Sequence, residues 1–124
     1  MIERIDLHAI RSWRHNGAGF GSGPQILWGD NGAGKTTLLE ACIVAAAGRS
    51  YRATALHDLL RGDEPAGAIT VAIGPGAGDS ADPLERTALG VEIPRSGRVR
   101  YSVAGQARAH AALAERIKVV ASVP

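Results

Sequence analysis

Alternation of apolar and polar positions predicts four strands, which cover residues 2–10, 68–73, 85–93 and 98–103. The first alternates imperfectly, with apolar side chains at Ile2, Ile5, Leu7 and Ile10. The third places Leu89, Val91 and Ile93 on one face, and the fourth turns Val99, Tyr101 and Val103 inward. Pro94 to Gly97 has the composition of a turn that joins the last two strands as an antiparallel pair.

Two further apolar runs, residues 26–28 and 117–121, also read as strands. Between the first strand and residue 25, the glycines of residues 16–24 predict turns, with Phe20 marking a short edge strand at most. Residues 74–83, rich in Gly, Asp and Pro, predict an exposed loop.

Helical spacing follows Lys35, where Leu39, Cys42, Ile43 and Ala46 fall on one face. The opposite side is rich in Ala, so we expect wide burial of this helix, which ends at Gly48. A second helix is predicted over residues 55–61, capped by Thr54 and ended by Gly62. Residues 106–116 have helical composition.

These elements predict an α/β fold in which mixed or antiparallel strands pack on one central helix. We expect residues 1–124 to form a single unit that resembles one lobe of a nucleotide-binding module more than a complete doubly wound domain.

Composition narrows the class of protein. Hydrophobic residues make up 45% of the chain, and the formal charge is only +2, which neither demands nor excludes a nucleic-acid partner. No apolar run approaches the length of a membrane span, and Cys42, the single cysteine, cannot form an internal disulfide. We therefore expect a cytoplasmic protein without a membrane partner.

One motif predicts what this chain binds. The sequence from Gly29 to Thr36 fits the phosphate-binding pattern G-x-x-x-x-G-K-S/T without mismatch, and it lies between an apolar run and a helix, as that motif requires. We call these residues the phosphate loop; its members are Gly29, Asp30, Asn31, Gly32, Ala33, Gly34, Lys35 and Thr36.

Such a loop binds anions at the N-terminus of the helix that follows it, where backbone N–H groups and the helix dipole both favour phosphate. Lys35 is expected to reach the β- and γ-phosphates of ATP, and the Thr36 hydroxyl to ligate Mg²⁺. The motif alone does not choose between transporter, kinase, helicase and chromosome-maintenance ATPases.

The flanks resemble the RecF family of DNA replication and repair proteins. Residues 7–13, LHAIRSW, are similar to its opening L-x-x-F-R-S-Y, with Ile10 and Trp13 in place of Phe and Tyr. Residues 29–41, GDNGAGKTTLLEA, match its loop and following helix except for Thr37, where Asn is usual. Gly48 to Arg52, Asp58 to Gly62 and Val119 to Pro124 resemble later segments in the family's order.

This resemblance implies an ABC-type ATPase head that acts as an ATP-dependent switch on single-stranded, gapped or duplex DNA. It also implies homodimerisation of the full-length head with ATP, and RecR and RecO as partners. The family completes its site with a Walker B strand and a signature motif, and neither pattern occurs in these residues. We therefore expect the N-terminal lobe alone, which binds nucleotide weakly and hydrolyses it negligibly.

Three alternatives stay open: a chromosome-maintenance head, which would need a long coiled coil, the ATPase subunit of a membrane transporter, and a non-functional remnant. Arg11 to Trp13 and Glu40-Ala41 speak against the transporter.

Several residues have both a functional and a structural interpretation. Arg11 either stacks near the adenine or is a surface arginine. Arg95, Arg98, Arg100 and Arg108 either contact DNA phosphates or form a solvated face. Cys42 and the four histidines are interpreted as structural or surface residues, because the histidines lack metal-ligand spacing.

Overall fold

The computed structural model describes residues 2–21, 25–29, 34–50, 53–74 and 87–114. These residues contain a six-stranded sheet in the order β2-β1-β3-β4-β5-β6, in which every neighbouring pair is antiparallel. The strands are β1 (Ile2–Ile10), β2 (Trp13–Gly19), β3 (Ala66–Ile73), β4 (Thr87–Pro94), β5 (Arg100–Val103) and β6 (Gln106–Arg108). The helices are α1 (Lys35–Ala47), the 3₁₀ turn η1 (Leu56–Leu59) and α2 (His110–Ala114).

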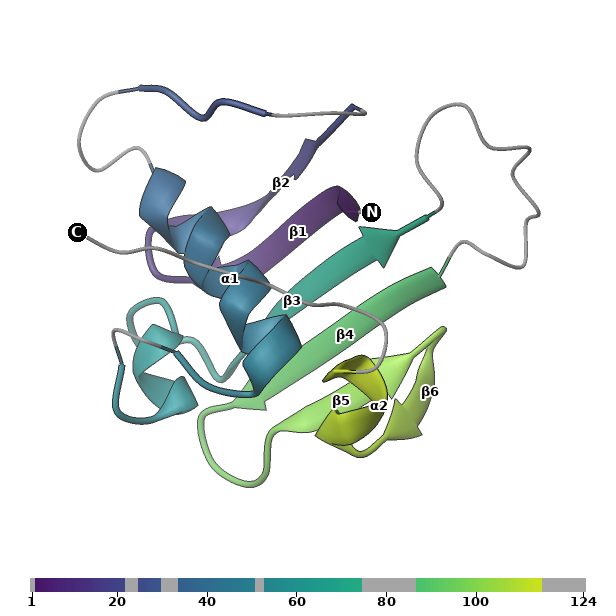
Figure 1. The fold of residues 1–124 in the computed structure, drawn as a ribbon. Coiled ribbons are helices and arrows are strands. Elements are labelled where there is room, and N and C mark those ends of the chain that lie inside the picture. Colours follow the sequence, from purple (N-terminus) through teal and green to yellow (C-terminus); the bar gives the residue numbers. More distant parts are fainter. Residues whose placement is uncertain (1, 22–24, 30–33, 51–52, 75–86, 115–124) are drawn as a thin grey trace.

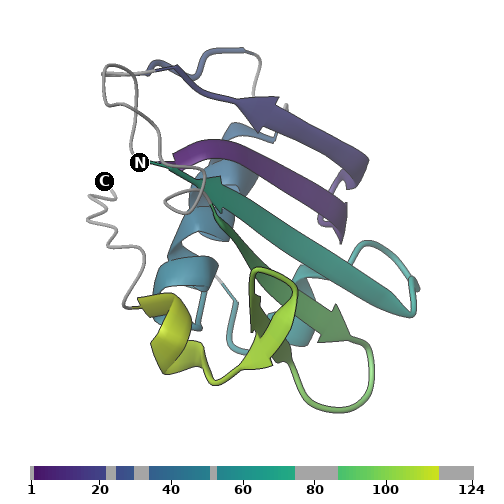
Figure 2. The ribbon, with the colours of Figure 1, turned by 90° about the vertical axis from the view of Figure 1, so that its right-hand side faces the viewer.

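Helix α1 lies across one face of the sheet, and the short α2 lies beside it over β5 (Figures 1 and 2). The inward side chains of β1, β3 and β4 meet the helix in one core. Its fully buried members include Ile5, Leu7, Ile69, Val71, Leu89, Val91 and Ile93. The predicted α/β arrangement, with antiparallel strands packed on the helix after the phosphate loop, is confirmed.

The predicted strands over residues 2–10, 68–73, 85–93 and 98–103 all occur, with bounds shifted by a few residues. The imperfect alternation of the first has two local causes. The register against β3 shifts between Ile2 and Arg4. Near the other end, Ala9 takes a left-handed conformation with φ of 52°, and both Ala9 and Ile10 are buried.

The predicted apolar face of α1 is wrong. The buried positions are Thr37, Leu38, Glu40, Ala41, Val44 and Ala45, whereas Leu39 is 55% exposed. Cys42, Ile43 and Ala46 are only partly buried. Because apolar residues surround the helix almost completely, their spacing could not identify the inward side. Gly48 ends the helix as predicted, and its N–H donates to the carbonyl of Val44.

Residues 16–19, predicted as turns, belong instead to the edge strand β2. The glycines at 17 and 19 are compatible with a strand here because they lie opposite the ion-paired side chains of Asp6 and Arg4. At Gly17 a β-carbon would overlap the Asp6 carboxylate. The turn between the first two strands is therefore short and lies at Arg11 and Ser12.

Residues 26–28 do not form the predicted strand. The six described strands pair without this segment, and an apolar run becomes a strand only where a neighbour supplies hydrogen bonds. Ile26 and Trp28 are 86% and 88% exposed in consequence.

Two predicted helices are also corrected. Residues 55–61 form only the 3₁₀ turn η1, which Asp58 caps by accepting from the N–H of Ala55, so Thr54 is not the cap. The beginning of the predicted helix over residues 106–116 is the strand β6, because Ala104 and Gly105 form a two-residue hairpin loop. Helix α2 then covers residues 110–114.

Predicted segments at 75–83 and 117–121 lie outside the described residues. No helix in the described part of the chain has the length and apolar character that crossing a membrane requires.

The hairpin between β5 and β6 yields a stability test. Ala104 and Gly105 have φ of 52° and 79°, the signs that a type I′ turn requires. Asn adopts the left-handed conformation at lower cost than Ala. We expect Ala104→Asn to raise the free energy of unfolding by up to about 1 kcal/mol. Chemical denaturation measures this change, and Ala107→Asn on β6 is the control. A stability equal to or below that of the unsubstituted chain would contradict the turn assignment.

Candidate functional site: a phosphate loop at the start of α1

Helix α1 begins at Lys35, immediately after Gly34, which takes a left-handed conformation with φ of 93°. No side chain caps this end of the helix, and its first turn carries no acidic residue. The N–H groups of the first turn of a helix have no intrahelical acceptor. The start of α1 is therefore suited to an anion rather than to a capping side chain.

The side chain of Lys35 reaches back over the loop. Its Nζ donates a hydrogen bond to the carbonyl of Gly29, the first loop residue. This exposed contact joins the described first residue of the phosphate loop to the start of α1. The remaining predicted members, Asp30, Asn31, Gly32 and Ala33, lie outside the described residues. Thr36 is exposed in the first turn of α1.

The indole of Trp13, the first residue of β2, packs directly against Gly34. A β-carbon placed on Gly34 would overlap the Nε1, Cε2 and Cζ2 atoms of that indole. Only glycine fits this position, because a side chain there would have to displace the ring and adopt a left-handed backbone. The sequence singled out Trp13 as part of a family motif, but nothing in the pattern indicated this contact.

Glu40 lies on the buried face of α1 with an exposed fraction of 1%, and Arg11 neutralises it. Arg11 Nε donates to Glu40 Oε1 at 2.8 Å, and its second nitrogen donates to Oε2 at 3.2 Å. This is the paired, forked geometry in which arginine binds a carboxylate most strongly. The hydroxyl of Ser50, just beyond the helix, also donates to Oε2 and accepts from the N–H of Ala53.

The turn that carries Arg11 is held on both sides. Arg11 has a φ of 50°, an unusual conformation for a residue with a side chain. Its N–H donates to the carbonyl of Leu59 at 2.7 Å, and the N–H of Arg61 donates to the carbonyl of Ala9 at 2.8 Å. Arg11 is thus not the surface arginine of the structural interpretation, because its guanidinium binds Glu40 and only 27% of its side chain is exposed. Its contact with adenine stays a prediction.

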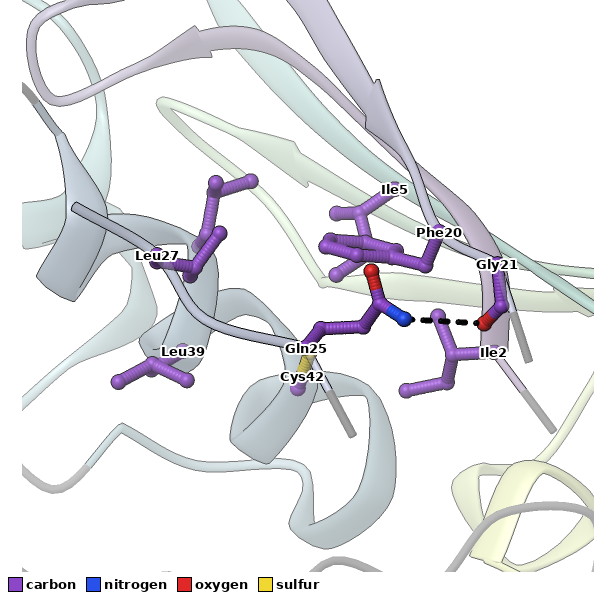
Figure 3. A pocket seen from close by; sticks show the side chains of 9 residues that line it. Ile2, Ile5, Phe20, Gly21, Gln25, Leu27, Leu39 and Cys42 are labelled. Carbon is purple, nitrogen blue, oxygen red and sulfur yellow. Dashed lines mark hydrogen bonds between the residues drawn. The ribbon is translucent and has the colours of Figure 1, made fainter. Parts of the chain in front are cut away.

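Beside the loop lies an apolar pocket of 270 Å³ between the sheet and α1 (Figure 3). Phe20 and Ile5 line it from the strand side, and Leu39 and Cys42 line it from the helix. Gln25 bridges its rim by donating to the carbonyl of Gly21. Burial raises the pKa of the Cys42 thiol, which favours the neutral packing role over a reactive one.

Three of the four C-terminal arginines contact other parts of the chain. Arg100 pairs with Glu92 at 2.5 Å, and Arg95 donates to the carbonyls of Gly62 and Glu64. Arg108 donates to Gln106, while Arg98 is exposed. Of the two interpretations, this arrangement favours a solvated, internally paired face over a continuous basic patch.

The histidines form no recognisable metal centre. His8 and His15 face each other across β1 and β2, with 3.3 Å between their Nδ1 atoms. Within the described ranges there is no group of three or more His, Cys, Asp or Glu side chains that could hold a metal.

Comparison with known proteins identifies families that this chain resembles. A family model described as an AAA domain matches residues 4–76. RecF of Stutzerimonas stutzeri, named a DNA replication and repair protein, is 40% identical over 93 residues, which are 74% of this chain and 24% of the relative. RecF of Shewanella pealeana is 26% identical over 124 residues, which are 99% of this chain and 32% of the relative.

Solved structures agree on the fold. A structure of RecF with ATP, described as a recombination mediator protein of the RecFOR pathway, superposes with a TM-score of 0.74 at 20% identity, covering 94% of this chain and 30% of that one. A structure from work on ATP-driven dimerisation of SMC ATPases superposes with a TM-score of 0.77 at 20% identity, covering 92% and 75%. The chain spans less than a third of the length of the curated relatives it matches.

The close contact at Gly34 yields a matched pair of substitutions. Gly34→Ala introduces a methyl group that overlaps Trp13, whereas Gly62→Ala, also at positive φ, meets nothing within 4 Å. Both carry the backbone cost of a left-handed alanine, about 1–2 kcal/mol. We therefore expect Gly34→Ala to lower the free energy of unfolding by at least about 1 kcal/mol more than Gly62→Ala.

Chemical denaturation of the two variants measures this difference. Adding Trp13→Ala to Gly34→Ala should remove most of it, since the overlapping ring is then gone. Equal losses in the two glycine variants would show that Trp13 does not press on Gly34.

Proposed function

We propose that this chain, which belongs to the AAA domain family, is the ATP-binding part of a RecF-like DNA repair protein. One observation carries the proposal: α1 begins directly after Gly34 with no capping side chain, and Lys35 reaches back to Gly29. That arrangement offers backbone N–H groups and one ammonium group to the same anion.

Each described loop residue has a distinct task in this proposal. Gly34 allows the backbone to approach the phosphates, and Lys35 leaves the Gly29 carbonyl to contact the β- and γ-phosphates. The Thr36 hydroxyl, exposed one residue later, is the oxygen donor that would hold Mg²⁺. The chemistry that Mg²⁺ would supply there is neutralisation of the phosphate charge.

The chain acts in DNA repair and replication as an ATP-dependent switch, and DNA is its macromolecular ligand. Its curated relatives are named RecF, and a structural neighbour was described for ATP-driven dimerisation. By the same family resemblance, RecR and RecO are partners and the full-length head forms a homodimer with ATP. We place the protein in the cytoplasm and assign residues 1–124 to a single RecF-like lobe.

RecF is favoured over a chromosome-maintenance head on sequence. The curated relatives that match by sequence are named RecF and share 26–42% identity with parts of this chain. Among the solved structures, RecF shares 20–22% and the SMC heads share 15–20%. Likeness at that lower identity supports a common fold and no more.

The first test removes the loop ammonium. Lys35→Ala should weaken the binding of a fluorescent ATP analogue by at least tenfold, because the phosphates lose a charge-assisted contact. Fluorescence anisotropy measures the dissociation constant. Lys118→Ala, which removes the only other lysine, is the control and should leave it within twofold. Affinity unchanged by Lys35→Ala would refute the phosphate-loop assignment.

The second test concerns the metal. Thr36→Val is expected to leave binding of the nucleotide without Mg²⁺ unchanged and to abolish the gain in affinity that Mg²⁺ provides, because valine has no oxygen donor. Titration of the analogue with and without Mg²⁺ separates the two effects. Thr54→Val, at an exposed position away from α1, is the control. A full Mg²⁺ response in the Thr36 variant would exclude this ligand.

A further inference from the structure

We propose that Arg11, acting through Glu40, and Trp13 are positioning residues that hold the phosphate loop in its binding geometry. This inference rests on the proposed function, since it assigns the support of that same site. Its basis is that the turn between β1 and β2 contacts α1 at two places, the N-cap residue Gly34 and the buried residue Glu40.

The two contacts lie at different levels of the helix. Residues 34 and 40 are six positions apart, which corresponds to about 9 Å along a helix axis. A contact at one level leaves a helix free to tilt or rotate about it, whereas two contacts fix both. Trp13 therefore sets where the helix begins, and Arg11 sets which way its first two turns face.

The turn itself is stiff enough to serve as the fixed side. Ala9 and Arg11 both have left-handed backbones, and each is held by a backbone hydrogen bond to the segment 59–61. Such conformations persist only where the surroundings over-determine them, and they concentrate at functional sites. Ser50 also donates to Oε2 of Glu40, so the carboxylate is held from the turn and from just beyond the far end of the helix.

Stability alone is a poor explanation for this ion pair. Replacing a buried pair by apolar residues of similar size is often neutral or stabilising, so we assign this pair a role in defining geometry rather than in adding stability. Binding by backbone N–H groups depends on that geometry, because a hydrogen bond weakens steeply as its donor and acceptor move out of line. The ion pair is thus expected to affect nucleotide affinity more than unfolding.

The outer face of β1 provides a matched control. Arg4 and Asp6 form an ion pair at 2.9 Å on the same strand, but on solvent-exposed side chains. Glu40→Gln and Asp6→Asn are therefore the same change from carboxylate to amide, but only Glu40 belongs to α1 and is buried. Arg11→Lys and Arg4→Lys form the second matched pair.

The experiment measures ATP-analogue dissociation constants and thermal midpoints for these variants, well below each midpoint. Glu40→Gln, Arg11→Lys and Trp13→Leu should each weaken binding at least tenfold. Asp6→Asn and Arg4→Lys should stay within twofold. The double variant Arg11→Met with Glu40→Met should keep a midpoint near that of the unsubstituted chain and still bind at least tenfold more weakly.

The outcomes separate the two proposals. Loss of binding in Lys35→Ala together with full affinity in the Glu40, Arg11 and Trp13 variants would overturn the positioning role and leave the phosphate loop intact. Failure of the unsubstituted chain to bind would overturn both. If Glu40→Gln unfolds, the apolar double variant and Trp13→Leu decide the matter, and full affinity in both rejects the inference.

Discussion

The buried ion pair between Arg11 and Glu40 is the constraint on which the site depends. A carboxylate at 1% exposure inside an apolar core is costly unless it is paired and hydrogen-bonded. The chain meets this requirement by bringing a left-handed turn, a helix and the connection at Ser50 to one point. Because Arg11 begins that turn and Glu40 lies on α1, the carboxylate fixes the helix against the sheet. The orientation of the first turn of α1, which follows the phosphate loop, is fixed in this way.

The same geometry leaves one side of the helix uncovered. With Glu40 and Thr37 turned inward, the apolar side chain of Leu39 faces outward and is 55% exposed. Leu39 and Leu27 also line the apolar pocket between α1 and the sheet.

Strand positions and the phosphate loop could be predicted because each is a local pattern: alternation for β3 and β4, and an eight-residue motif for the loop. The inward side of α1 could not, because its decisive residue is charged and its partner lies 29 positions away. The strand predicted over residues 26–28 is wrong because a strand needs a neighbouring strand to pair with, and the motif gives no information about such a neighbour. The resemblance to RecF marked Arg11, Trp13, Glu40 and Ser50, but their contacts became visible only in three dimensions.

The central claim is that this chain holds its ligand by the phosphates. Isothermal titration calorimetry of ATP, AMP and adenosine against the same protein tests that claim most directly, because the three ligands share the base and sugar and differ only in phosphate. The account predicts measurable binding of ATP, much weaker binding of AMP and no measurable binding of adenosine. Equal affinity for adenosine and ATP would contradict it.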